Sequence, residues 1–202
     1  MPRPTLFLPP AVRDTLVSHA SAGAPAEVCG VLLGTDRESD TVRVTDSRSV
    51  PNVASEPRTR YELDPAATAA VFEAVEGDGT AAEHDRPGDA DGTPGRSTGV
   101  VGFYHSHPRG PPGPSATDRA QAQWPGYVYL IVSLEREPEQ GTATEATADT
   151  DPEGEGTEIG AWRWTGEAFE ALTVRVGDAG SVGTDTDAES AGSEADDGTG
   201  PG

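Results

Sequence analysis

Two histidines, a serine and an aspartate lie close together in the segment YHSHPRGPPGPSATD, residues 104–118. His105 and His107 end a run of β-branched and aromatic residues that predicts a strand, and residues i and i+2 of a strand point to the same face. Their imidazoles could therefore reach one metal ion. Asp118 follows a Pro- and Gly-rich loop and opens the next predicted helix, so its carboxylate could be a third ligand. Three such ligands leave a position for water, as in catalytic zinc sites.

Hydrolysis at such a site also needs a proton carrier and a donor to developing negative charge. Glu27 starts the apolar segment EVCGVLLG, which predicts a buried strand that could lie beside the one ending in His105. We expect its carboxylate to take a proton from a metal-activated water and to pass it to the leaving nitrogen. Ser115 precedes Asp118 by three residues, and its hydroxyl could donate to an oxyanion.

Each of these residues also has an ordinary structural interpretation. Ser115 and Asp118 have the spacing of a capping box, with Ser as N-cap and the acid at N3, and capping is compatible with catalysis. A lone histidine at a strand end can be a polar rim residue, and a lone acid after a loop is unremarkable. Cys29 is interpreted as a small buried apolar residue. His19 and His84 have no evident partner in the sequence.

The elements that would position these residues follow from hydrophobic periodicity and from turn residues. We expect helices at 11–22, 66–76 and 115–124, and strands at 27–34, 41–50, 98–107, 127–134, 159–166 and 167–176. Prolines before residue 11 are typical of a helix start, which supports the first helix. Asp64 as N-cap and Pro65 as first-turn residue support the start of the second helix. The last two strands form a hairpin turned at Thr165-Gly166. This alternation predicts an α/β fold, a mixed sheet with helices packed on it.

Three segments have compositions typical of disorder: two acidic inserts, at 77–98 and 135–157, and an acidic tail at 177–202. They are rich in Gly, Asp, Glu and Thr and offer few apolar groups to offset the entropy of ordering. About 130 residues remain, which suits one compact domain. We therefore predict a single domain over 1–176, carrying both inserts, followed by the tail.

The charge of the chain is strongly one-sided, with 35 acids against 14 bases and a net charge of −21. All of the bases are Arg. Such a charge argues against nucleic acid and anionic membrane surfaces as partners. Acid excess without Lys suggests a salt-rich environment, where self-repulsion is screened. A single cysteine fits a reducing compartment, and the N-terminal MPRPTLFLPPAV is a poor signal peptide, so we expect a cytoplasmic protein.

The whole pattern resembles the JAMM, or MPN+, metalloprotease family. Its signature is an upstream Glu, then H-[ST]-H, seven residues, Ser, two residues and Asp, and every position is matched by Glu27, His105, Ser106, His107, Ser115 and Asp118. The resemblance implies the MPN domain, a curved mixed β-sheet with flanking helices. It also implies one zinc ion per chain, bound by His105, His107 and Asp118, with Glu27 as general acid/base and Ser115 as oxyanion donor.

The chain looks most similar to stand-alone prokaryotic members, among them archaeal desampylase-like proteins. That resemblance implies an isopeptidase whose partners are ubiquitin-like modifier proteins and their lysine conjugates. An alternative is a zinc hydrolase that processes the C-terminus of a ubiquitin-like sulfur-carrier protein. A second alternative is a non-catalytic MPN scaffold with a structural metal, which would need a fourth protein ligand.

The segment SVPNVASEPRTRYELD is expected to hold the C-terminal tail of a protein substrate. It is loop-like at first and strand-like at residues 60–63. An extended tail is best held by addition to a strand edge, and a narrow groove beside the metal would accept only Gly at the last positions. We therefore predict cleavage after tails that end in Gly-Gly.

Overall fold

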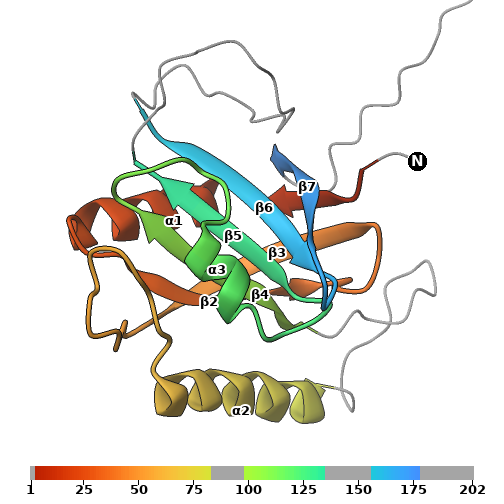
Figure 1. Ribbon diagram of the computed structural model, residues 1–202. Helices are drawn as coiled ribbons and strands as arrows, with labels where there is room; N and C mark the ends of the chain where they lie inside the picture. The colour runs from red at the N-terminus through yellow and green to blue at the C-terminus, as the bar shows by residue number, and fades with distance from the viewer. Residues whose placement is uncertain (1–2, 83–97, 135–155, 178–202) are drawn as a thin grey trace, which may run out of the picture.

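A mixed seven-stranded β-barrel forms the centre of the protein (Figure 1). The computed structural model describes residues 3–82, 98–134 and 156–177. Their strands are β1 (Thr5–Leu8), β2 (Cys29–Thr35), β3 (Thr41–Val50), β4 (Gly99–His107), β5 (Val128–Ser133), β6 (Glu158–Trp164) and β7 (Phe169–Val176). Their helices are α1 (Pro10–Gly23), α2 (Pro65–Ala82) and α3 (Ala116–Gln121).

The strand order round the barrel is β1-β3-β2-β4-β5-β6-β7, with β1 and β7 also paired. β1 is parallel to both of its neighbours, β4 is parallel to β5, and the other pairs are antiparallel. The predicted mixed α/β fold and the closing hairpin of β6 and β7 are confirmed. The sequence did not predict β1, which closes the barrel, because four residues between prolines are too few to show periodicity.

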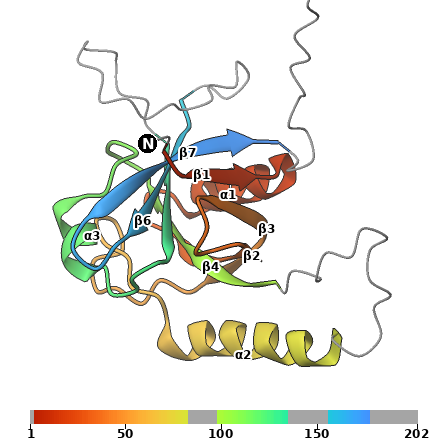
Figure 2. The same ribbon diagram turned by 90° about the vertical axis from the view of Figure 1, so that its right-hand side faces the viewer.

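Two apolar clusters lie on the two faces of this sheet. The inner cluster takes residues from all seven strands, and Val12, Leu16 and Ala20 of α1 pack into it. The outer cluster covers β2, β4 and β5 and includes Phe103 and Tyr129, against which α2 packs. Figure 2 shows α2 running along the outside of the barrel and α1 beside β1 and β3. β4 thus has a helix on either side, and its alternating side chains face two environments.

Helix α2 begins as the sequence predicts. The backbone N–H of Ala67 donates to Asp64 Oδ1 at 2.7 Å, so Asp64 caps the helix. The helix continues to Ala82, so the prediction of disorder from residue 77 is wrong for 77–82. A nucleated helix gains one hydrogen bond for each added residue, which lets it pass glycines. The rest of that insert, at 83–97, lies outside the described residues, as do 135–155 and 178–202.

None of the helices in the described ranges is long and apolar enough to cross a membrane.

Candidate metal centre

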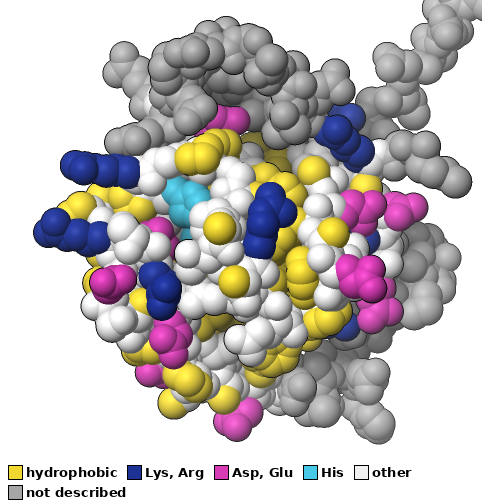
Figure 3. Space-filling model, in the orientation of Figure 1, with side chains coloured by type: hydrophobic (Ala, Val, Ile, Leu, Met, Phe, Trp, Pro, Cys, Tyr) yellow, Lys and Arg dark blue, Asp and Glu magenta, His cyan; other side chains and the backbone are white. Residues whose placement is uncertain are grey.

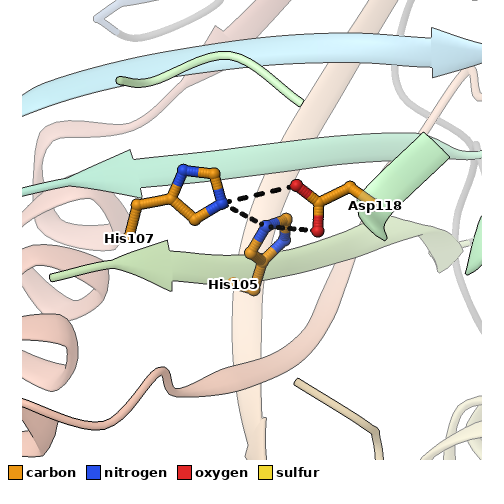
Figure 4. A group of neighbouring side chains, drawn as sticks. All are labelled: His105, His107 and Asp118. Carbon is orange, nitrogen blue, oxygen red and sulfur yellow. Dashed lines mark hydrogen bonds and ion pairs between the residues drawn. The ribbon is translucent and has the colours of Figure 1, made fainter. Parts of the chain in front are cut away.

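The two histidines of β4 project from one face at the C-terminal end of the strand (Figure 4). His105 is 1% exposed and His107 is 6% exposed. Their Nε2 atoms are 3.1 Å apart. The intervening Ser106 points to the opposite face, as strand geometry requires. The sequence prediction that both imidazoles lie at the end of a strand and can reach one point is confirmed.

Asp118 reaches the same point from the first turn of α3. Its Oδ1 lies 3.3 Å from Nε2 of His105, and its Oδ2 lies 3.4 Å from Nε2 of His107. The carboxylate is buried in spite of its charge. A capping box holds it, because the Ser115 N–H donates to Oδ2 and the Asp118 N–H donates to Ser115 Oγ. The predicted capping interpretation is therefore confirmed.

These three residues fit the ligand set of a zinc ion. Each offers one ligand atom, and the three atoms lie within 4.8 Å of one another. Two ligands about 2.05 Å from a tetrahedral zinc are roughly 3.3 Å apart. The two Nε2 atoms are 3.1 Å apart, and each of them lies 3.3–3.4 Å from a different oxygen of the Asp118 carboxylate. The donors are two imidazoles and one carboxylate, which suits a catalytic rather than a structural zinc. Among the described residues, His105, His107 and Asp118 form the group of His, Cys, Asp and Glu side chains that lie close enough together to bind a metal ion.

Neighbouring groups fix the orientation of both imidazoles. Nδ1 of His107 lies 2.8 Å from the carbonyl oxygen of Pro111. A carbonyl only accepts, so Nδ1–H donates and Nε2 keeps its lone pair for a metal. The ring of Tyr61 stacks on His105, with centroids 4.1 Å apart and an interplanar angle of 19°. Sequence reasoning could not find the contact of Tyr61 with His105, because Tyr61 lies 44 positions earlier in an irregular loop.

The titration behaviour of the three residues follows from their mutual contacts. Burial alone would raise the pKa of Asp118, but its hydrogen bonds to both histidines hold that pKa far below its usual range. Burial lowers the pKa of His105. Burial also acts to lower the pKa of His107, yet the interactions with Asp118 and Pro111 outweigh it and raise that pKa. The carboxylate is thus ionised and negatively charged, as a metal ligand must be.

Glu27 lies in the segment just before β2, not within the strand, which begins at Cys29. The prediction that Glu27 starts the strand is therefore wrong, although β2 does pair with β4 as predicted, with Cys29 opposite His105. Glu27 is 8% exposed, and burial raises the pKa of its carboxyl to about 7. The charge of His107 opposes this shift and that of Asp118 adds to it. Both residues thus act on Glu27 through their charges.

Ser106 attaches the Glu27 segment to β4. Its Oγ accepts from the N–H of Val28 at 3.0 Å, and its own N–H donates to the carbonyl of Val28 at 2.9 Å. Ser106 is fully buried. The residue between the two histidines therefore holds the residue next to Glu27, which the H-S-H motif alone does not reveal.

Asn52 connects Glu27 to the loop that carries Tyr61. Its amide nitrogen donates to the carbonyls of Glu27 at 2.8 Å and Arg60 at 3.1 Å. Its amide oxygen accepts from the N–H groups of Ala54 and Glu62, both at 3.0 Å. These four bonds use the full capacity of a primary amide. An Asn in a loop is ordinary in sequence, so sequence reasoning could not find this role.

Ser115 and Cys29 differ in the chemistry that their surroundings permit. Ser115 is exposed, and its Oγ accepts the N–H of Asp118, which leaves its own hydrogen to donate elsewhere.

Cys29 is fully buried, and its Sγ contacts the carbonyl of Val50. Burial, with the charge of Glu27 added, raises the pKa of the Cys29 thiol to about 12. It therefore remains a protonated thiol, and its interpretation as a buried apolar residue is confirmed.

The sequence also matches a family model, that of prokaryotic homologues of the JAB domain, over residues 9–147. The chain belongs to the JAB family, also called JAMM. This JAB protein is 44% identical over 168 residues to a desampylase of Haloferax volcanii, an alignment that covers 81% of this chain and 91% of the relative. It is 32% identical over 128 residues to a CysO-cysteine peptidase of Mycobacterium tuberculosis, covering 62% of this chain and 70% of the peptidase.

The JAB fold is also found among solved structures. A protein of Desulfitobacterium hafniense superposes with a TM-score of 0.62 at 20% identity, covering 86% of this chain and 94% of that one. A protein of Salinibacter ruber superposes with a TM-score of 0.52 at 28% identity, covering 87% and 94%. The family and the α/β fold that the motif implied are thus confirmed.

Proposed function

We propose that this JAB protein is a zinc-dependent isopeptidase that removes ubiquitin-like modifier proteins from lysine side chains. The observation that carries the proposal is the convergence of His105, His107 and Asp118 within 4.8 Å. The buried carboxyl of Glu27 interacts with the charges of two of these residues, His107 and Asp118. The 44% identity to a protein named desampylase supports this class of substrate.

Each residue of the site has a part in the proposed reaction. A zinc ion bound by His105, His107 and Asp118 would supply a Lewis acid and lower the pKa of a water molecule. Glu27 would accept the proton of that water and deliver it to the lysine nitrogen as the isopeptide bond breaks. Ser115 would donate its free hydroxyl hydrogen to the carbonyl oxygen as negative charge develops there.

The segment at residues 60–63 remains our candidate for holding the tail of the modifier. Only one bridge pair forms there, between Asn52 and Leu63, so it is less regular than the strand that the sequence suggested. Glu62 directs its N–H and C=O to Asn52 and Val53. Alternation of an extended chain turns the backbone groups of Tyr61 and Leu63 the other way, toward a strand that could be added.

A pair of matched conjugates tests the proposal. A ubiquitin-like protein is joined to a lysine side chain through a tail ending in Gly-Gly, and a second conjugate ends in Ala-Ala. We expect rapid release from the Gly-Gly conjugate, little from the Ala-Ala conjugate, and none after chelation. The Glu27→Gln variant is the control for a contaminating protease. Failure of the zinc-loaded protein to cleave the Gly-Gly conjugate would refute the proposal.

Processing of a carrier-protein tail is a second candidate, favoured by the 32% identity to a CysO-cysteine peptidase. It uses the same residues on a substrate whose C-terminal Gly carries an amino acid through its α-nitrogen. Rates on matched substrates that differ only in α- or ε-nitrogen linkage distinguish the two. A scaffold role is disfavoured because the metal-binding group offers three protein ligands among the described residues and not four.

A further inference from the structure

Arginines in the described ranges include two contrasting groups. Arg37, Arg43 and Arg48 each form an ion pair with a nearby acid. Five others are exposed and form no ion pair with any acid in the described ranges. Four of them lie close in the chain to residues of the metal centre, namely Arg58, Arg60, Arg109 and Arg119, and the fifth, Arg175, lies on β7. In a chain with 35 acids and 14 bases, cations without acidic partners are unexpected.

These four arginines, which we name the arginine rim, are chain neighbours of the metal centre. Arg60 precedes Tyr61, whose ring stacks on His105. Arg58 follows Pro57, whose carbonyl accepts the N–H of Glu27. The positions are therefore fixed by contacts at the site.

The other two rim arginines belong to the segment that carries the proposed metal ligands. Arg109 comes two residues after His107, and Arg119 follows Asp118 in α3. The guanidinium carbon of Arg119 lies 5.8 Å from the centre of the Phe169 ring, a contact that leaves its charge unneutralised. Figure 3 shows arginine side chains on both sides of the exposed part of a histidine on this face.

We propose that the arginine rim binds carboxylates on the folded body of the ubiquitin-like substrate protein while its tail occupies the metal centre. This inference rests on the proposed function. The net charge of −21 repels an acidic partner from most of the surface. A partner with acids around its tail can approach closely only where cations lack acidic partners. Exposed Glu56 and Glu62 share a loop with two of the arginines but pair with neither, so the four cations remain available.

Arginine suits such a role at high ionic strength. Its planar guanidinium binds a carboxylate through two parallel hydrogen bonds. Contacts of this kind persist when salt screens long-range attraction, since the screening length at 1 M salt is about 3 Å. Each exposed pair strengthens binding by about 1.4- to 5-fold. Four additive pairs would contribute about 4- to 600-fold to affinity, and we take the middle of that range, roughly 10- to 100-fold, as the expected contribution.

Binding to the inactive Glu27→Gln background tests the inference. The probe is an acidic ubiquitin-like protein with a Gly-Gly tail, and its match has the surface Asp and Glu of the body replaced by Asn and Gln. Titrations are made with the rim intact and with all four rim residues changed to Gln. We expect the intact rim to bind the acidic probe roughly 10- to 100-fold more tightly than the neutral one. The four-Gln variant should bind the acidic probe no more tightly than the neutral one, because only the repulsion between the two acidic proteins remains.

Arg175→Gln is the matched control, since Arg175 is exposed and lies on β7, three strands from β4 in the barrel. It should leave both affinities unchanged. A preference for the acidic probe that survives in the four-Gln variant would overturn the inference, as would the lack of any preference with the intact rim. Deletion of the acidic residues 178–202 provides a further check. If deletion raises affinity only when the rim is intact, the rim holds the chain's own tail and the inference is wrong.

A failure of the proposed function would be detected by a different measurement from a failure of the arginine rim. The proposed function is read from cleavage of the Gly-Gly conjugate by the zinc-loaded wild type. The rim is read from the binding of an unconjugated probe to the Glu27→Gln variant.

Rates on a short Gly-Gly tail peptide, which lacks a body, are compared between wild type and a variant with Arg58, Arg109 and Arg119 changed to Gln. Arg60 is kept here, because it belongs to the segment proposed to hold the tail. The two rates should differ by less than about twofold, because the three contacts lie outside the tail. An equal loss on peptide and conjugate would show that the arginines act on the chemistry and not on docking.

Discussion

Histidines lie on both sides of β4, and the two sides use them for different purposes. On the outer side, His105 and His107 meet the carboxylate of Asp118. On the inner side, His19 of α1 meets the hydroxyl of Tyr104, with Nδ1 and the oxygen 2.9 Å apart. A phenol with a raised pKa brings no negative charge. The comparison shows that a buried anion, rather than a histidine alone, distinguishes a metal centre from a packing contact.

The largest expected effect comes from removing a histidine on the outer side. His107→Ala leaves two protein ligands, so zinc affinity should fall by more than the ~10- to 100-fold that loss of an outer-shell partner costs. Hydrolysis should fall to background. The measurements are zinc content after dialysis and conjugate cleavage. A variant that keeps one zinc per chain would break the assignment of the outer side as the metal centre.

Glu27→Gln should separate metal binding from proton transfer on the same side. The variant keeps every proposed ligand, so zinc content should remain at one per chain. Turnover should fall by about 10²–10⁴-fold, the usual contribution of a positioned acid or base. Metal analysis and kcat from the same preparation check this. A fully active Glu27→Gln enzyme would require a different proton carrier.

Ser115→Ala should have a smaller effect with two parts. Loss of an oxyanion donor typically lowers kcat by about 10²–10³-fold, and loss of an N-cap costs about 1 kcal/mol of stability. Thermal unfolding and kcat are measured together. Ser115→Asp is the informative companion, because it restores a cap acceptor without a hydroxyl donor. If Ser115→Asp recovers full activity, Ser115 acts only as a cap.

Asn52→Leu should disturb the outer side without touching a ligand. It leaves four backbone groups without their amide partner, at a cost of about 1–3 kcal/mol for each that stays buried and unpaired. We expect lower stability and a kcat reduced by about 10-fold, because a small displacement of Glu27 weakens proton transfer. Zinc content should be unchanged. A stable variant with wild-type kcat would show that Asn52 does not position Glu27.

The smallest effect is expected on the inner side. His19→Gln should leave zinc and turnover unchanged and cost about 1 kcal/mol for its hydrogen bond. Burial lowers the pKa of His19 from 6.5, so the folded protein favours neutral His19. Neutral His19 therefore contributes its full share of the unfolding free energy above about pH 6.5, the pKa of histidine in the unfolded chain. This stabilisation is lost as the pH falls below that value, because the unfolded state then binds more protons than the folded state.

Unfolding free energies of wild type and His19→Gln, compared between pH 8 and pH 5, check that sign. The difference between the two proteins should be largest at pH 8 and shrink toward pH 5. A loss of zinc in His19→Gln would remove the distinction between the two sides of β4.

Much of the site was predictable because its information is local. The H-S-H spacing and strand period place two imidazoles on one face, and the Ser115–Asp118 spacing specifies a capping box that directs the carboxylate. The end of α2 was less predictable, since tertiary packing and helix propagation carry a helix past residues of poor propensity.

The sequence by itself determined the donor types, their order, and the strand and helix that carry them, since these depend on residues only a few positions apart. Only the tertiary structure decided which distant groups surround them. Pairing of β2 with β4 brings Glu27 to residues some 80 positions away, and the loop at 51–64 brings Tyr61 to His105. Closure of the barrel by β1 and the placement of the arginine rim were likewise decided only by the tertiary structure. Contacts of this kind depend on strand register and side-chain packing over the whole barrel, and no local pattern encodes them.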